Sequence, residues 1–214
     1  MKLTMKLMMT CLAGAMTLSG CMTVEGGGVG GGPDVGEPAG RDIGAYDALN
    51  ARADAVGRLA DSNVFPLLPT GNLSYSGAAI ASDVSINGEN GYRMVGNLNM
   101  RVNFSGSTSD VNGEITNIDL FDGRTPIERL AGDLDVDATF TRSGRTLAGD
   151  ASGELRGVFD NGTEGTVDMT WGLDGDMRRV SGNNSYAFYG DDTTGSGDGV
   201  VEIEINDGQY YATR

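Results

Sequence analysis

Two stretches of the sequence decide the predicted fold: residues 96–104 read Gly-Asn-Leu-Asn-Met-Arg-Val-Asn-Phe, and residues 132–140 read Gly-Asp-Leu-Asp-Val-Asp-Ala-Thr-Phe. In both, apolar and polar residues alternate. The apolar positions are Leu98, Met100, Val102 and Phe104 in the first stretch and Leu134, Val136, Ala138 and Phe140 in the second. Because successive side chains of a strand point to opposite faces, this pattern predicts strands with one buried and one solvated face.

The same two-residue period continues through six further segments, at 73–80, 111–120, 147–159, 167–173, 186–188 and 201–205. Glycine, asparagine, aspartate and serine separate them, as is typical of turns. Each of the two opening stretches is followed by Asp-x-x-Gly-Glu-(Ile/Leu)-x-x-(Ile/Val), at 110–118 and at 150–158. We interpret these pairs as a duplicated hairpin, which predicts an antiparallel meander of about eight strands.

An antiparallel sheet with one apolar face covers that face by folding over as a sandwich or by closing as a barrel. Between Leu147 and Phe159 the apolar face carries mainly glycine and alanine. Small inward residues suit a tight barrel, where strands coil sharply or opposite walls approach. The sequence therefore predicts an all-β fold with a single antiparallel barrel, whose interior is filled by side chains or holds one small ligand.

The N-terminus is typical of an export signal. Lys2 and Lys6 flank the start of an apolar stretch at 7–18, which is too short to span a membrane as a helix. It runs into Leu-Ser-Gly-Cys at 18–21, which resembles the lipobox of bacterial lipoproteins. This resemblance implies cleavage before Cys21 and acylation of its thiol by a fatty acid such as palmitate. The alternative is an ordinary secreted protein that is cut nearby and keeps Cys21 as a free thiol.

One helical pattern lies between Asp42 and Asp61, where apolar residues recur every three or four positions. They are Tyr46, Leu49, Ala53, Val56 and Ala60. Asp42 is the expected N-cap, and Pro66 and Pro69 forbid continuation. We expect this weakly amphipathic helix to pack on its own domain rather than on a membrane or a partner.

The predicted organisation is a signal peptide at 1–20, a lipidated cysteine and glycine-rich flexible tether at 21–40, a short helix and proline-containing linker at 41–70, and the barrel at 71–214.

The charge balance limits the partners of the chain. Both lysines precede Cys21, so the segment from residue 21 onward carries 13 arginines against 30 acidic residues, a formal net charge of −17. Such a surface repels nucleic acid and anionic lipid headgroups. The chain has no histidine, which removes imidazole bases and histidine metal ligands. With no catalytic cysteine either, we predict that the protein is not an enzyme and uses no cofactor.

Two further candidate sites remain. Aromatic residues gather near the C-terminus and are candidates for a ligand-binding patch, with the barrel core as the alternative; they are Trp171, Tyr186, Phe188 and Tyr189. The acidic segment 191–199 offers oxygen ligands for calcium, with a plain hairpin loop as the favoured alternative. Its candidate ligands are Asp191, Asp192 and Asp198.

The hairpins resemble the β-barrel domain of the transferrin-binding protein B family and of related surface lipoproteins of the factor H binding protein type. The resemblance rests on the glycine-rich leader, on the Gly-x-Leu-x-(Met/Val)-x-(Val/Ala)-x-Phe strands at 96–104 and 132–140, and on Gly-Glu-Leu-Arg-Gly-Val-Phe at 153–159 followed by Gly-Thr-Val at 165–167. It covers roughly residues 71–206 and implies a barrel held at the outer membrane by a lipid anchor. No handle region or loop motif of that family can be matched here, so the resemblance does not imply transferrin as a ligand.

These observations lead to three functional hypotheses. The first is a lipid-anchored module that binds a protein or a small molecule, in nutrient or metal acquisition for example. The second is a structural envelope lipoprotein without a soluble ligand. The third is an integral outer-membrane barrel, because alternating strands also suit lipid contact. The localisation we expect is the outer membrane, with the domain on the cell surface or on the periplasmic face.

Overall fold

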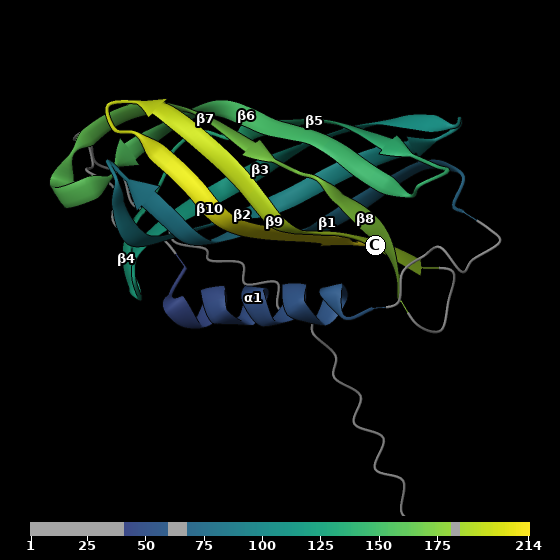
Figure 1. Ribbon diagram of the computed structural model, residues 1–214, viewed down its shortest axis with the longest axis horizontal. Helices are drawn as coiled ribbons and strands as arrows, with labels where there is room; N and C mark the ends of the chain where they lie inside the picture. Colours follow the sequence, from purple (N-terminus) through teal and green to yellow (C-terminus); the bar gives the residue numbers. More distant parts are fainter. Residues whose placement is uncertain (1–40, 60–67, 181–184) are drawn as a thin grey trace, which may run out of the picture. The chain divides into compact units, whose positions relative to one another are not determined.

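The computed structural model describes residues 41–59, 68–180 and 185–214, which form one helix and an antiparallel sheet (Figure 1). The export signal, Cys21 and the tether lie outside the described residues. The helix is α1 (Ile43–Gly57), and a 3₁₀ turn covers Asp160–Gly162. The strands are β1 (Gly71–Ile86), β2 (Glu89–Phe104), β3 (Thr108–Asp122), β4 (Thr125–Arg129), β5 (Leu134–Thr141), β6 (Thr146–Val158), β7 (Glu164–Gly172), β8 (Gly175–Val180), β9 (Ser185–Gly199) and β10 (Ile203–Thr213).

The sheet closes on itself as a barrel. The strands follow the order β10-β1-β2-β3-β5-β6-β7-β9, and β9 pairs again with β10, which completes a ring of eight. β7 and β8 both lie between β6 and β9 and act as two halves of one interrupted strand. β4 lies off the ring and pairs only with the end of β3. The prediction of a single antiparallel barrel of about eight strands is confirmed.

The duplicated hairpin is also present. β2 pairs antiparallel with β3, and β5 pairs antiparallel with β6. β1 and β2 extend beyond the predicted segments and meet at a tight turn of Asn87 and Gly88, both with positive φ. Positive φ at two successive residues is the geometry of a two-residue hairpin turn, and Asn-Gly is the sequence that favours it.

The segment 191–199 corrects one expectation, because it is a strand and not a hairpin loop. It continues β9 and pairs with β10 on one side and β7 on the other. The glycines permit this close pairing: a Cβ added at Gly195 would lie 2.6 Å from the carbonyl oxygen of Thr170 on β7. Two further strands, β4 and β8, were not predicted, because each is short and lacks a clear alternation.

The barrel interior is filled by side chains. Its cluster of buried residues includes the single tryptophan, Trp171, and four aromatic rings in successive edge-to-face contact. Those rings belong to Tyr75, Phe104, Phe140 and Phe188, with centroids 4.9 to 6.4 Å apart. This geometry is the favourable one for aromatic pairs. The interior is therefore a packed core over the part of the chain that the structure describes.

Small inward residues on β6 serve the coiling of the sheet. A Cβ added at Gly149 would lie 2.4 Å from the Cα of Ala138, and one at Gly153 would lie 2.3 Å from the carbonyl oxygen of Asp133. Ala138 lies in β5 and Asp133 directly precedes it, so both contacts are with the backbone of the strand next to β6 in the ring. Of the two reasons for small residues in a tight barrel, sharp coiling against the adjacent strand is the one that applies here.

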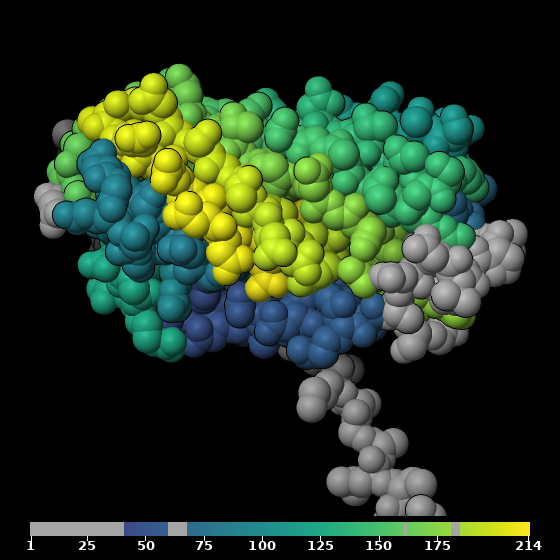
Figure 2. Space-filling model, viewed as in Figure 1, coloured from purple at the N-terminus to yellow at the C-terminus, as the bar shows by residue number. Residues whose placement is uncertain are grey.

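Helix α1 packs on the outside of the barrel, where Figure 2 shows its atoms directly against those of β9 and β10. Asp42 is the N-cap as predicted, since its carboxylate accepts a 2.7 Å hydrogen bond from the backbone N–H of Ala45. The helix buries Tyr46, Ala53 and Val56. The barrel residues beneath are Ala78, Ile80, Val95, Phe121, Ala187, Tyr189 and Tyr211.

The exterior is otherwise polar. Among the described residues Val200 is the only large hydrophobic side chain that is exposed, and no described helix has the length and apolar character needed to cross a membrane. In the strict patterns at 96–104 and 132–140 the apolar side chains point inward and their polar neighbours point outward, whereas Ile80 of the predicted strand 73–80 lies on the outside beneath α1.

Candidate functional site

A groove of about 600 Å³ crosses the outer surface of β1, β2 and β3 at the end of β10. It is lined by Ser74, Tyr75, Ser76, Asn99, Met100, Arg101, Asn112, Gly113, Glu114, Thr213 and Arg214. A volume of this size is in the range of small-molecule sites. The groove is open to solvent and lies outside the packed core, so a ligand there would bind against the barrel wall.

The strand register brings the polar residues of the groove together. Ser74 pairs with Arg101, which pairs with Asn112 on β3. One step along the strands, a second row runs from Ser76 through Asn99 to Glu114. These six side chains are exposed, whereas Tyr75 and Met100 between them are buried and face the interior. Three consecutive strands thus present one polar surface.

The groove is rich in hydrogen-bond donors. Hydroxyls come from Ser74, Ser76 and Thr213, and two amides come from Asn99 and Asn112. The charged side chains of the lining are two arginines, Arg101 and Arg214, and one glutamate, Glu114. In a chain whose formal net charge is −15, this local excess of arginine is a departure from the general surface. Such a set suits a ligand with carboxylate, hydroxyl or peptide carbonyl acceptors.

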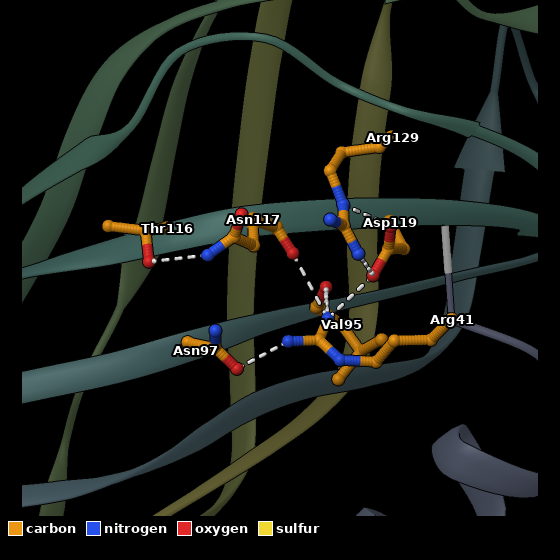
Figure 3. A network of polar contacts seen from close by, with 7 residues as sticks. All are labelled: Arg41, Val95, Asn97, Thr116, Asn117, Asp119 and Arg129. Carbon is orange, nitrogen blue, oxygen red and sulfur yellow. Dashed lines mark hydrogen bonds and ion pairs between the residues drawn. The ribbon is translucent and has the colours of Figure 1, made fainter. Parts of the chain in front are cut away.

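A second cluster lies where the helix begins and centres on the buried carboxylate of Asp119 (Figure 3). Its Oδ2 accepts a 2.7 Å hydrogen bond from Nη1 of Arg41, and its Oδ1 accepts a 2.9 Å bond from Nε of Arg129. Nη1 of Arg41 also donates to the carbonyl oxygens of Val95 and Asn117, at 3.2 and 3.0 Å.

The Arg41 guanidinium is satisfied on several sides, since its Nη2 also donates to the amide oxygen of Asn97. Burial lowers the pKa of Arg41 from its ordinary value, and the charge of Asp119 opposes that shift. A positive φ at Asn117 accompanies a register irregularity in the β2–β3 pairing, and Asp119 then faces outward beneath Arg41. Because the carboxylate of Asp119 and both terminal nitrogens of Arg41 have partners within the protein, we assign this cluster to holding the start of α1 against the barrel.

Sequence reasoning missed this cluster. The only clue was an aspartate inside an apolar run, Ile-Asp-Leu-Phe at 118–121, where an unpaired charge would be unfavourable. Nothing in the sequence indicated that Arg41, 78 positions earlier, supplies the partner.

The structure places the predicted aromatic residues in two different packed regions. Trp171, Tyr186 and Phe188 are in the barrel interior, and the indole N–H of Trp171 donates a 3.1 Å bond to the hydroxyl of Thr193. Tyr189 lies on the outside under α1, where the guanidinium of Arg178 is 5.5 Å from its ring centroid. Packing accounts for all four, and they share no surface.

The predicted calcium ligands lie along β9. Asp191, Asp192 and Asp198 are exposed, and Asp198 pairs with Asp168 of β7. Within the described ranges, no three acidic, cysteine or histidine side chains are arranged so that they could hold a metal ion. The aromatic residues therefore form no shared surface patch, and the three aspartates form no metal site within the described residues. The groove on β1–β3 was not predicted from the sequence.

Comparison with protein-family models, with curated proteins and with solved structures finds no match.

Proposed function

We propose that this protein is a lipid-anchored envelope lipoprotein, attached to the outer membrane through Cys21, whose barrel binds a ligand in the groove on β1–β3. The observation that carries the proposal is the groove itself, in which six exposed polar side chains from three strands converge beside the last two residues of the chain. Because the barrel interior is filled, a ligand would bind on the outside of the barrel, where the groove lies.

The Arg41 cluster suits a tethered domain. Arg41 directly follows the predicted tether of residues 21–40 and is bound to β2 and β3 through Asn97 and Asp119. Using about 5–6 Å × √n for a glycine-rich coil, a tether of this length separates its ends by roughly 25 Å on average. In this proposal the clamp fixes the point at which the tether ends, and the barrel is held at that distance from the bilayer.

Two hypotheses from the sequence are affected by the geometry. Exposed polar side chains on the strands, with Val200 as the one large apolar exception among described residues, weigh against a membrane-inserted barrel. A structural envelope lipoprotein without a ligand remains the second candidate, and the filled interior is the observation that favours it. We also propose that the protein is not an enzyme, because the chain contains no histidine and the groove presents no nucleophile beside a base.

Ligand binding in the groove is testable by NMR on the Cys21→Ser form of the full mature chain, with fractionated envelope extract as the ligand source. We expect a fraction to shift the amide resonances of Asn99, Arg101 and Asn112 saturably. Arg101→Ala should weaken that effect, whereas Arg156→Ala should not, because Arg156 is an exposed arginine of β6 outside the groove. Shifts confined to other surfaces, or none at any concentration, would favour the structural role.

A further inference from the structure

Along Gly71–Tyr75, the first five residues of β1, one edge has no partner among the strands that the structure describes. β10 ends at Thr213, which lies opposite Ser76, so the ladder between β10 and β1 stops there. Residues Gly71–Tyr75 continue to pair with β2, from Phe104 to Met100, but no described strand pairs with their other side. A strand edge with free backbone groups is a template for another extended chain.

The orientation of the backbone shows which groups face away from β2 on this edge. The carbonyl oxygen of Ser76 accepts a hydrogen bond from the Thr213 hydroxyl at 3.5 Å and so faces β10. Backbone groups of residues two apart point to the same side of a strand. The N–H and C=O groups of Ser74 and Asn72 therefore face the open side, and both residues are exposed.

The side chains beside this edge define what a bound strand would carry. A strand continuing the line of β10 would place its inward residues next to Leu73 and Tyr75, which contact the barrel core. Its outward residues would lie two strand spacings from Arg101, about 10 Å. Because Ser74 between them is small, a glutamate side chain and the Arg101 guanidinium can meet above it.

We propose that this edge and the adjoining groove take an extended peptide segment of a partner protein with alternating apolar and acidic residues, bound by β-strand addition. The inference rests on the proposed binding function and specifies its ligand. Main-chain hydrogen bonds to Asn72 and Ser74 supply affinity, while Arg101 and Arg214 select acidic side chains. The arginines favour this occupant over a basic peptide, which the acidic surface of the protein attracts elsewhere.

The test uses the Cys21→Ser full mature chain and a blocked hexapeptide of alternating valine and glutamate as the probe. We expect saturable binding by calorimetry and slowed hydrogen exchange at the amides of Asn72 and Ser74. N-methylation of alternate peptide bonds should weaken binding at least tenfold, because it removes the donors to the edge. Exchanging glutamate for lysine should weaken binding as well.

Protein variants complete the design. Arg101→Ala should weaken peptide binding about threefold, as expected for one exposed ion pair, with Arg156→Ala as the matched control. Ser74→Pro removes the N–H that Ser74 would donate to the bound peptide and should abolish binding. The variant should still fold, because proline is tolerated at strand edges. If the peptide fails to bind at 1 mM while an envelope fraction still shifts the Arg101 resonance, strand addition is wrong and the groove function stands. Binding that is indifferent to N-methylation, or self-association of the protein through this edge in sedimentation, would also overturn it.

Discussion

Replacing Asp119 with asparagine removes the negative charge on which Arg41 and Arg129 converge, while the shape of the side chain is kept. The Asp119 side chain is 2% exposed, against 14% for Arg41 and 35% for Arg129. Breaking a buried ion pair by removing one partner costs about 3–5 kcal/mol. Because both arginines retain some contact with water, we expect the lower end, a loss of about 3 kcal/mol in the free energy of unfolding.

The assay is equilibrium urea denaturation, followed by the fluorescence of Trp171, the single tryptophan of the chain. For a domain of this size, 1 kcal/mol corresponds to about 2–4 °C in Tm, so the thermal midpoint should fall by roughly 6–12 °C. Asp47→Asn is the control, because Asp47 pairs with Arg124 at 2.7 Å in an exposed position and should contribute less than about 1 kcal/mol. Equal effects of the two substitutions would refute the reasoning that the Asp119 cluster clamps the helix.

Three further predictions concern the core and its rim. Burial raises the pKa of Tyr46 to about 12, above its value near 10 in the unfolded chain. The neutral Tyr46 side chain therefore contributes fully to the free energy of unfolding below pH 10, and this contribution is lost as the pH rises toward 12. Urea midpoints between pH 9 and 11.5 should therefore fall less steeply in Tyr46→Phe than in the wild type, and equal slopes would contradict this. Gly149→Ala forces a methyl group to within 2.4 Å of the Ala138 Cα and should destabilise the barrel by about 1–3 kcal/mol, measured by thermal unfolding; an unchanged Tm would show that β6 can shift. Thr193→Val leaves the buried indole N–H of Trp171 without its acceptor and should lower the free energy of unfolding by about 1–3 kcal/mol; a neutral result in urea denaturation would show that another acceptor replaces it.

The alternation of apolar and polar residues was sufficient to predict the antiparallel strands and their inward faces, because the inward face is fixed by parity along each strand. The small inward residues between Leu147 and Phe159 were needed to predict a barrel rather than a sandwich. The strict patterns at 96–104 and 132–140 place their apolar positions in the core as expected. The same rule fails near Asn117, where an irregularity changes the parity and turns Asp119 outward. A pattern rule cannot foresee such a change, since it depends on pairing with another strand.

The groove was unpredictable for a related reason. Its side chains lie on the polar positions of three strands, which the sequence marks only as solvated. Their meeting depends on the register that sets Ser76 beside Asn99 and Asn99 beside Glu114, and on where β10 stops. The aromatic residues that were candidates for a ligand-binding patch are explained by packing, because alternation along β7 and β9 directs Trp171 and Phe188 into the core.

Fractionation of cells that express the full chain, compared with its Cys21→Ser variant, tests the lipid anchor on which the account depends. We predict that the wild type sediments with the outer membrane and that Cys21→Ser is recovered in the soluble fraction, after which protease treatment of intact cells shows which side the barrel faces. If Cys21→Ser remained in the membrane fraction as the wild type does, acylation of Cys21 would not be what holds the barrel there, and the tethered binding module would be contradicted.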